Sequence, residues 1–538
     1  MYGSMMQQPL LISTLLVHAE RHHGEQEMVS RRVEGDIHRT TYRALAARSR
    51  KMANALASIG IKSGDRVATL AWNGYRHVEL YYAVSGSGAV LHTLNPRLHP
   101  DQVVYIADHA EDQALFFDLT FLPLVEATFG RVKTIKTFVA MTDRAHMPAT
   151  TTIPNLLCYE ELADAASDVF AWPEFDENQA SSLCYTSGTT GNPKGVLYSH
   201  RSNYIHTLTM LQPDVMGLSV RDTVLAVVPM FHANAWGLAF SCPAVGAKMV
   251  MPGPKMDGAS IHELIETEGV TFSAAVPTVW QMLLAHLRAT KGTLSTLKRV
   301  AIGGSAVPEV LIRAFHDEFG VDVMQLWGMT ESSPLGTVAA LTPEIAALPF
   351  DQQIPYRLKQ GRPPVGVQLK LTDEEGQPVS RDGEEFGRLS MKGPFVVREY
   401  FRSEGGTILD DDDFFDTGDV ATIDPEGYMR ITDRSKDVIK SGGEWISSIE
   451  IENIAAGHPK AFIAAVIGIP HPKWEERPLL LVQLKPGETA TPDEFIAFLD
   501  GKIAKWWIPE EVRFVDEIPL GGTGKIDKKL IRQRMAPV

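Results

Sequence analysis

The chain contains 538 residues, of which 44% are hydrophobic and 22% are charged, and its formal net charge is −15. This length exceeds what one hydrophobic core supports, so two or more domains are expected, and the composition is ordinary for a soluble globular protein. The acidic balance argues against nucleic acid as a partner. Since no stretch of the sequence reaches the roughly 20 apolar residues of a membrane span, we expect a cytoplasmic protein without an integral membrane segment.

Cysteine spacing and the N-terminus disfavour two further classes. Cys158, Cys184 and Cys242 lie far apart and match neither a disulfide framework nor a zinc site. The apolar patch at residues 9–17 has no preceding Lys or Arg and runs into charged residues. This pattern predicts the start of an amphipathic helix rather than a signal peptide.

Short apolar strands alternate with longer helical segments, which favours an α/β architecture. The unit that starts at Asp65 has a weak echo in the unit that starts at Asp222. Either two similar α/β lobes or the general likeness of strand–helix–strand units accounts for this echo. The predicted elements are a helix at 75–85 and strands at 67–71, 89–92, 114–117, 181–185, 196–198 and 323–327.

The pattern changes near Asp433, where a hairpin ends and a compact α+β unit begins. In this unit Thr491, Pro492 and Glu494 have the residue types of a helix start with a capping box. The apolar spacing extends that helix to Ile503, and a strand follows at 512–515. We therefore predict two domains, at residues 1–432 and 433–538.

The segment at residues 185–195, with the sequence YTSGTTGNPKG, combines hydroxyl side chains, glycines and one lysine. Exposed backbone N–H groups of such a loop can wrap the phosphates of a nucleotide. The segment is not a Walker A loop, because Pro193 and Gly195 flank Lys194 where that motif has Gly and Ser or Thr. A flexible surface loop is the alternative for a short stretch of this composition.

Further motifs follow this loop in a fixed order and cover nearly the whole chain. Together they resemble the AMP-forming acyl-CoA synthetases of the adenylate-forming superfamily. The motifs are PMFH at 229–232, GGSA at 303–306, WGMTE at 327–331, DTGD at 416–419, DRSKDVIK at 433–440, SGGEW at 441–445 and GGTGK at 521–525.

The resemblance implies a fold, a reaction and its co-substrates. The fold is a large N-terminal domain of two α/β lobes and a small β-barrel-like lobe, with a mobile α+β C-terminal domain hinged at Asp433. A carboxylate attacks the α-phosphorus of ATP, giving acyl-AMP and diphosphate, and the thiol of coenzyme A then gives thioester and AMP. ATP, Mg²⁺ and coenzyme A are the implied ligands, and a homodimer is the implied assembly.

Four residues carry the implied chemistry. Lys525 reaches over from the small domain to bridge the carboxylate and the α-phosphate. Thr330 donates to the α-phosphate and Glu331 binds Mg²⁺, which prefers oxygen ligands; Thr186 is the second implied metal ligand. His232 helps to place the reacting groups, although a single His near apolar residues is also common as a core residue.

The remaining implied site residues fall into three groups. Trp327 offers a flat face to adenine and Asp419 accepts from the ribose hydroxyls. The implied ATP or AMP ligands are Thr186, Ser187, Gly188, Thr189, Thr190, Gly191, Lys194, Gly304, Ser305, Gln325, Trp327, Gly328, Thr330, Asp419, Arg434 and Lys525. The implied coenzyme A ligands are Lys436, Lys440, Gly442, Gly443, Glu444 and Trp445, and the implied acyl pocket contains Trp236, Gly303 and Pro334.

Alternative interpretations remain for parts of this site. Trp236 shares a face with His232 if their segment is helical, and a packed core tryptophan is the alternative to an acyl-pocket role. A basic surface turn is the alternative for Lys436 and Lys440.

The resemblance points to a carboxylic acid:CoA ligase. His232 stands where amino-acid-activating relatives have an aspartate, so an α-amino acid is disfavoured. The chain resembles medium- and long-chain fatty-acyl and 3-methylmercaptopropionyl-CoA ligases, which implies a short- or medium-chain or fatty acid as the substrate. Two other hypotheses are an enzyme that loads a carrier protein and a non-catalytic adenylate-binding protein.

Overall fold

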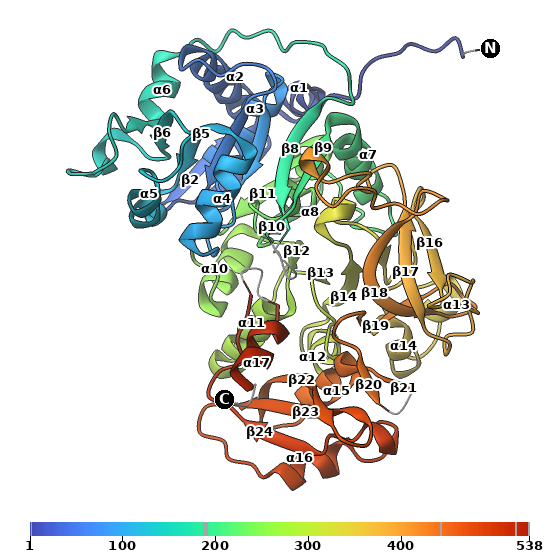
Figure 1. Cartoon of the computed structure of the whole chain (residues 1–538). Helices are drawn as coiled ribbons and strands as arrows, with labels where there is room; N and C mark the ends of the chain where they lie inside the picture. Colours follow the sequence, from blue (N-terminus) through green and yellow to red (C-terminus); the bar gives the residue numbers. More distant parts are fainter. Residues whose placement is uncertain (2, 187–191, 442–443, 522–524, 536–538) are drawn as a thin grey trace.

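The computed structural model describes residues 1–538 except residues 2, 187–191, 442–443, 522–524 and 536–538, and for residues 444 and 445 only the backbone. Strands of the described residues form four sheets (Figure 1). Two large sheets build most of the molecule, a small antiparallel sheet lies beside them, and the fourth sheet belongs to the C-terminal region. No helix of the residues described here is long and apolar enough to cross a membrane.

The first large sheet contains seven strands in the order β7-β6-β5-β3-β4-β8-β9. Its neighbours are parallel except β8 and β9, which form an antiparallel hairpin. All the strands predicted in this region are present. The strands are β3 (Arg66–Leu70), β4 (Val90–Thr93), β5 (Asp112–Phe117), β6 (Thr137–Ala140), β7 (Leu157–Cys158), β8 (Ala180–Tyr185) and β9 (Gly195–Ser199).

The second large sheet contains eight strands in the order β15-β14-β13-β12-β10-β11-β1-β2. Its inner neighbours are parallel, and only the edge pairs β14–β15 and β1–β2 are antiparallel. The strands are β1 (Glu27–Arg31), β2 (Ile37–Thr41), β10 (Thr223–Ala226), β11 (Lys248–Met251), β12 (Phe272–Ala275), β13 (Arg299–Gly303), β14 (Asp322–Trp327) and β15 (Thr337–Val338). As in the first lobe, the paired strands β10 and β11 enclose a helical connection.

The helix α3 (Tyr75–Gly86) joins the two lobes, and all twelve of its residues are buried. Its sequence is apolar on most sides, which is typical of a helix that is covered all round. The Tyr82 hydroxyl donates to the carbonyl of Ala239 at 2.9 Å, and the Tyr81 hydroxyl donates to the carbonyl of Met230. Side chains of the first lobe are thereby fixed to the backbone of the second.

The third sheet is antiparallel, with strands in the order β16-β17-β18-β19. We expected a lobe resembling a β-barrel, but the edge strands β16 and β19 do not pair within the described residues, so this sheet is open. The strands are β16 (Gln368–Thr372), β17 (Gly387–Lys392), β18 (Phe415–Ile423) and β19 (Met429–Arg434). Asp433, the expected domain boundary, lies within β19 and pairs with Val420.

The C-terminal region is an α+β unit with its own core. Strands run in the order β21-β20-β23-β22, and β24 pairs with β23. The strands are β20 (Ile439–Ser441), β21 (Glu444–Ile446), β22 (Ala461–His471), β23 (Glu475–Leu484) and β24 (Glu511–Phe514), and the helices are α15 (Ser448–Ala456), α16 (Pro492–Leu499) and α17 (Lys528–Met535).

The helix α16 starts where the sequence predicted, with the Thr491 N–H donating to Glu494 at 3.2 Å. It ends at Leu499, however, and does not reach Ile503. Gly501 has a φ of 74°, a left-handed conformation that commonly follows the end of a helix. The backbone already leaves the helical conformation at Asp500, which has a φ of −61° and a ψ of 133°, although the apolar spacing continues beyond it.

Most of the remaining helices cover the large sheets, whereas α13 (Pro343–Ala346) lies beside the third sheet (Figure 1). The others are α1 (Ile12–His23), α2 (Tyr42–Ser58), α4 (Pro100–Ala110), α5 (Leu122–Thr128), α6 (Tyr159–Ala165), α7 (His200–Met210), α8 (Ala233–Trp236), α9 (Leu238–Val245), α10 (Gly258–Glu268), α11 (Pro277–Thr290), α12 (Glu309–Phe319) and α14 (Phe350–Arg357). Short 3₁₀ turns occur at Leu119–Phe121, Arg144–His146, Thr330–Ser332, Phe401–Ser403 and Lys505–Trp507.

Candidate active site

A cavity of about 860 Å³ lies where the carboxyl ends of strands from both lobes approach the C-terminal region. Ligand sites of α/β sheets form at such strand ends, because the loops that follow the strands are free to carry functional groups. Fifteen residues predicted from the sequence line this one cavity. They are Thr186, Lys194, His232, Trp236, Gly303, Gly304, Ser305, Gly328, Thr330, Glu331, Pro334, Asp433, Arg434, Lys436 and Lys525.

The predicted phosphate loop starts and ends on the β8–β9 hairpin. At its neck the Thr186 N–H donates to the carbonyl of Lys194 at 2.9 Å, and the Lys194 N–H donates to Thr186 Oγ1 at 3.2 Å. These two bonds fix the backbone of Lys194 beside the cavity. Ser187, Gly188, Thr189, Thr190 and Gly191, also predicted as nucleotide ligands, lie outside the described residues.

Thr330 and Glu331 follow β14 in a short 3₁₀ turn, as expected for residues delivered by a strand end. Both are buried, with Glu331 only 7% exposed. The Tyr198 hydroxyl donates to the main-chain carbonyl of Thr330 at 2.7 Å, and the Tyr400 hydroxyl donates to Glu331 Oε1 at 2.8 Å. Among the ion pairs of the described residues, none includes Glu331, so its carboxylate keeps its negative charge free for a cation in the cavity.

Lys525 crosses from the C-terminal region into the cavity. A Cβ atom added to Gly304 would lie 3.5 Å from Lys525 Cε, and Gly304 itself has a φ of 89°. Burial and, secondly, the positive charge of Arg434 lower the pKa of Lys525 from 10.5 to about 8. The side chain is therefore an ammonium donor that sits close to another cation, an arrangement that favours an anionic ligand.

Asp419 and Arg434 face each other at the edge of the cavity. Arg434 Nε lies 2.9 Å from Asp419 Oδ1, and Trp327 Nε1 donates to Asp419 Oδ2 at 3.2 Å. Asp419 is 3% exposed, and burial raises its pKa, although Arg434 and Lys525 oppose that shift. The sequence predicted these three residues as nucleotide ligands, and the structure brings them into direct contact with one another.

His232 and Trp236 do not share the face of a right-handed helix, so this expectation was wrong. Ala233, Asn234, Ala235 and Trp236 have φ values of 43°, 56°, 53° and 52°, a left-handed turn. Such a turn of non-glycine residues is strained and needs support from its surroundings. The buried Asn234 side chain supplies part of that support by donating to Asn203 Oδ1 at 3.2 Å.

The turn places the Trp236 ring against β13. A Cβ atom on Gly303 would lie 3.0 Å from Trp236 Cη2 and 2.9 Å from the carbonyl of Leu326. Glycine at position 303 is therefore required for the indole to pack there. Burial, and to a lesser extent the charge of Lys525, lower the pKa of His232 to about 4, which keeps its imidazole neutral near pH 7.

Several residues that were predicted to belong to the site lie away from the cavity or outside the part of the chain that the structure describes. Gln325 is buried and donates to the carbonyls of Leu358 and Lys359 at 3.0 and 2.8 Å, so it acts as a structural link. Lys440 is half exposed and lies 3.8 Å from Glu374. Gly442 and Gly443, and the side chains of Glu444 and Trp445, lie outside the described part of the chain.

Sequence reasoning missed two tyrosines that hold the site together. Tyr198 lies on β9 and Tyr400 follows β17, and their hydroxyls bind Thr330 and Glu331. No local pattern marks either residue, because each binds a partner that is far away in the chain. Only a search for buried tyrosines near the predicted motifs could have found these two residues.

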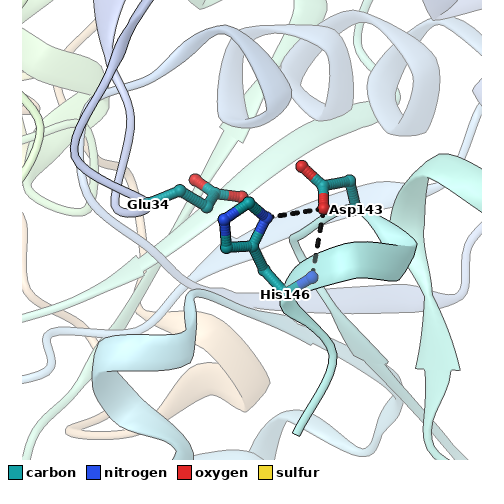
Figure 2. A group of neighbouring side chains, drawn as sticks. All are labelled: Glu34, Asp143 and His146. Atoms are coloured by element: carbon teal, nitrogen blue, oxygen red, sulfur yellow. Dashed lines mark hydrogen bonds and ion pairs between the residues drawn. The ribbon is translucent and has the colours of Figure 1, made fainter.

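A second group of ionisable side chains, Glu34, Asp143 and His146, lies where the β1–β2 connection of the second large sheet meets the β6–β7 connection of the first (Figure 2). His146 Nδ1 and Asp143 Oδ1 are 2.7 Å apart, and two arginines pair with the carboxylates. Arg76 lies 2.8 Å from Glu34, and Arg32 lies 3.2 Å from Asp143. Because these guanidinium groups already balance the carboxylates, we interpret the group as a structural ion-pair network.

The fold and the cavity are those of an α/β enzyme, with strand ends of both lobes and a lysine of the C-terminal region around the cavity. Residues 16–401 match the family described as "AMP-binding enzyme", and residues 450–525 match "AMP-binding enzyme C-terminal domain". The chain belongs to the AMP-binding enzyme family, and within it to the acyl-CoA ligases.

Two curated relatives and one solved structure illustrate this membership. The chain is 52% identical to "3-methylmercaptopropionyl-CoA ligase" of Ruegeria lacuscaerulensis, over 99% of this chain and 98% of that one. It is 48% identical to "Medium-chain-fatty-acid--CoA ligase" of Ectopseudomonas oleovorans, over 100% and 98%. The crystal structure of ATP-bound MatB from Rhodopseudomonas palustris superposes with a TM-score of 0.81 at 26% identity, over 97% and 98%.

We predict that Lys525→Ala lowers the rate of acyl-adenylate formation by roughly 10²- to 10³-fold, the scale for losing one charge-stabilising donor. Acid-dependent exchange of pyrophosphate into ATP measures this step. The matched control is Lys502→Ala, an exposed lysine of the C-terminal region that stacks on Phe498. Exchange at the wild-type rate in Lys525→Ala would contradict the assigned role.

The lowered pKa of Lys525 also predicts the pH dependence of adenylation. The protonated form binds phosphate, and with a pKa of about 8 its population falls above pH 8 instead of above pH 10.5. We expect kcat/KM for ATP to decline as the pH rises through about 8. A profile that stays flat to pH 10 would show that this ammonium group is not needed.

Proposed function

We propose that this acyl-CoA ligase joins a short- or medium-chain carboxylic acid to coenzyme A through an acyl-adenylate. The observation that carries the proposal is the convergence of Lys194, Glu331 and Lys525 on one cavity that continues to Trp236. Charged groups suited to a triphosphate thus adjoin an apolar wall suited to an acyl chain.

In the first half-reaction, a carboxylate oxygen bonds to the α-phosphorus of ATP and the bond to the departing pyrophosphate breaks. Two anions must meet, so the protein has to supply positive charge and alignment. We assign Lys525 to the carboxylate and the α-phosphate, and Lys194 to the other phosphates. His232, neutral at physiological pH because of its lowered pKa, is assigned to donate a hydrogen bond there without adding charge.

In the second half-reaction, the coenzyme A thiol bonds to the acyl carbon and AMP departs with the electron pair of the broken C–O bond. We propose that the C-terminal domain, residues 433–538, turns about Asp433 between the two steps. In support, Lys525 and Lys436 line the cavity while Lys440, another of the proposed coenzyme A ligands, lies on the surface beside Glu374. Lys525 and Lys440 belong to the same domain, so a rotation exchanges them.

The residues present fit a magnesium ion. Glu331 offers a buried carboxylate whose only described side-chain partner is a neutral hydroxyl, and Mg²⁺ prefers oxygen ligands. Glu331 and Thr186 would hold the ion. When bound, it neutralises charge on the phosphates.

The substrate is proposed from the acyl pocket. Trp236 is 7% exposed, packs against Gly303 and forms part of an apolar wall of the cavity. A compact acid such as 3-methylthiopropionate suits this wall, and the names of two relatives agree with such a range. Loading of a carrier protein is the alternative, and saturation by free coenzyme A distinguishes the two. A cytoplasmic homodimer is proposed from the family resemblance alone.

The test is a panel of straight-chain acids from C2 to C16 together with 3-methylthiopropionate, assayed for AMP release with ATP, Mg²⁺ and coenzyme A. We expect the highest kcat/KM for 3-methylthiopropionate and acids of short or medium length. A maximum at C16 would contradict the pocket assignment. Failure of every acid to release pyrophosphate would contradict the proposed function itself.

A further inference from the structure

The connection between β17 and β18 passes the neck of the phosphate loop, and we call its residues 397–405 the strap. Figure 1 shows this orange segment beside β9. The Val397 N–H donates to the carbonyl of Glu331 at 2.7 Å. A Cβ atom on Gly195 would lie 2.9 Å from Phe401 Cβ, so the strap packs directly on the start of β9.

Tyr400 is the strap residue that contacts both sides of the proposed triphosphate site. Its hydroxyl donates to Glu331 Oε1 at 2.8 Å, and Lys194 Nζ lies 4.7 Å from the centre of its ring. The side chain is 9% exposed, and its hydroxyl, neutral at physiological pH as in an ordinary tyrosine, is the donor in this hydrogen bond. One side chain therefore fixes both a carboxylate and a lysine.

The neutrality of Tyr400 matters for the charges on each side. An arginine or lysine bound to Glu331 would cancel the negative charge that a divalent cation needs. A carboxylate bound to Lys194 would cancel the positive charge that phosphate needs. The tyrosine orients Glu331 through a hydroxyl and Lys194 through a ring face, and it leaves both charges in place.

The far end of the strap is anchored to the other end of the phosphate loop. Glu404 lies 3.2 Å from His109 Nε2, and His109 Nδ1 lies 2.6 Å from the hydroxyl of Tyr185, the residue that precedes the loop. Arg402 pairs with Glu111 at 2.5 Å. The strap is thus held from both ends, so the position of Tyr400 is fixed relative to the loop neck.

We propose that Tyr400 is a positioning residue. It holds the side chains of Lys194 and Glu331 in the relative positions that a metal-bound triphosphate requires. The proposal rests on the proposed function, because it concerns the adenylation half-reaction of the same site. It assigns no chemical step to Tyr400, which acts through the two charged residues.

The test compares Tyr400→Phe with the wild-type protein in binding a non-hydrolysable ATP analogue by calorimetry, with and without Mg²⁺. Loss of the hydroxyl frees Glu331 but keeps the ring under Lys194. We expect the affinity in Mg²⁺ to fall about tenfold, the usual loss for a hydrogen bond to a charged group, and the affinity without Mg²⁺ to change less than about twofold. Tyr400→Leu removes both contacts and is expected to weaken binding in both conditions.

The matched control is Tyr428→Phe, because this buried tyrosine of the third sheet donates to the carbonyl of Ala340 at 2.8 Å and does not line the cavity. A Tm for each variant checks folding, and Tyr400→His, which keeps a ring and a polar hydrogen, replaces Tyr400→Phe if that variant is unstable. For Tyr400→His we expect a smaller loss than for Tyr400→Leu in Mg²⁺.

A second measurement tests whether Tyr400 acts through Glu331. In a Glu331→Gln background, Tyr400→Phe is expected to cause no further loss that depends on Mg²⁺. Equal affinity of wild type and Tyr400→Phe in Mg²⁺, or an additive loss in the double variant, would overturn the inference. Failure of the wild type to bind the analogue would instead overturn the proposed function.

Discussion

The structure depends on one electrostatic constraint, which is that two anions can react only where the protein gathers positive charge. The chain as a whole carries −15, so this charge has to be concentrated locally. Lys194, Arg434 and Lys525 line one cavity, where burial and, secondly, repulsion from Arg434 lower the pKa of Lys525. An anionic ligand offsets that repulsion, so the same arrangement that strains the protein favours binding of a polyphosphate.

The fold meets this constraint by bringing distant segments to one place. The carboxyl ends of β13 and β14 supply glycines and the Thr330–Glu331 pair, while the β8–β9 hairpin supplies Lys194. The buried helix α3 fastens the two lobes together, which fixes these strand ends relative to one another. Lys525 comes from a unit with a separate core, so it is the contribution that the proposed domain movement would withdraw.

Neutral side chains orient the charged ones without cancelling them. Tyr400 holds Glu331 and stacks against Lys194, while Tyr198 fixes the backbone of Thr330. Asp419 differs, because Arg434 pairs with it directly and Trp327 donates to its other oxygen. The residues that we propose to face phosphate or metal thus have neutral support, whereas Asp419 and Arg434 at the edge of the cavity are paired with each other.

The sequence by itself determined the α/β lobes, several of their strands and the identity of the residues that meet in the cavity, because periodicity and motif order are local properties of the chain. Local spacing failed where backbone conformation overrode it: the extended backbone of Asp500 ended α16 early, and the left-handed turn separated Trp236 from the face expected for His232. Only the tertiary structure decided which side chains hydrogen-bond to the residues of the site. Tyr400 and Glu331 are 69 residues apart in the chain, and a hydrogen bond over that separation follows from how the sheets pack rather than from any local pattern.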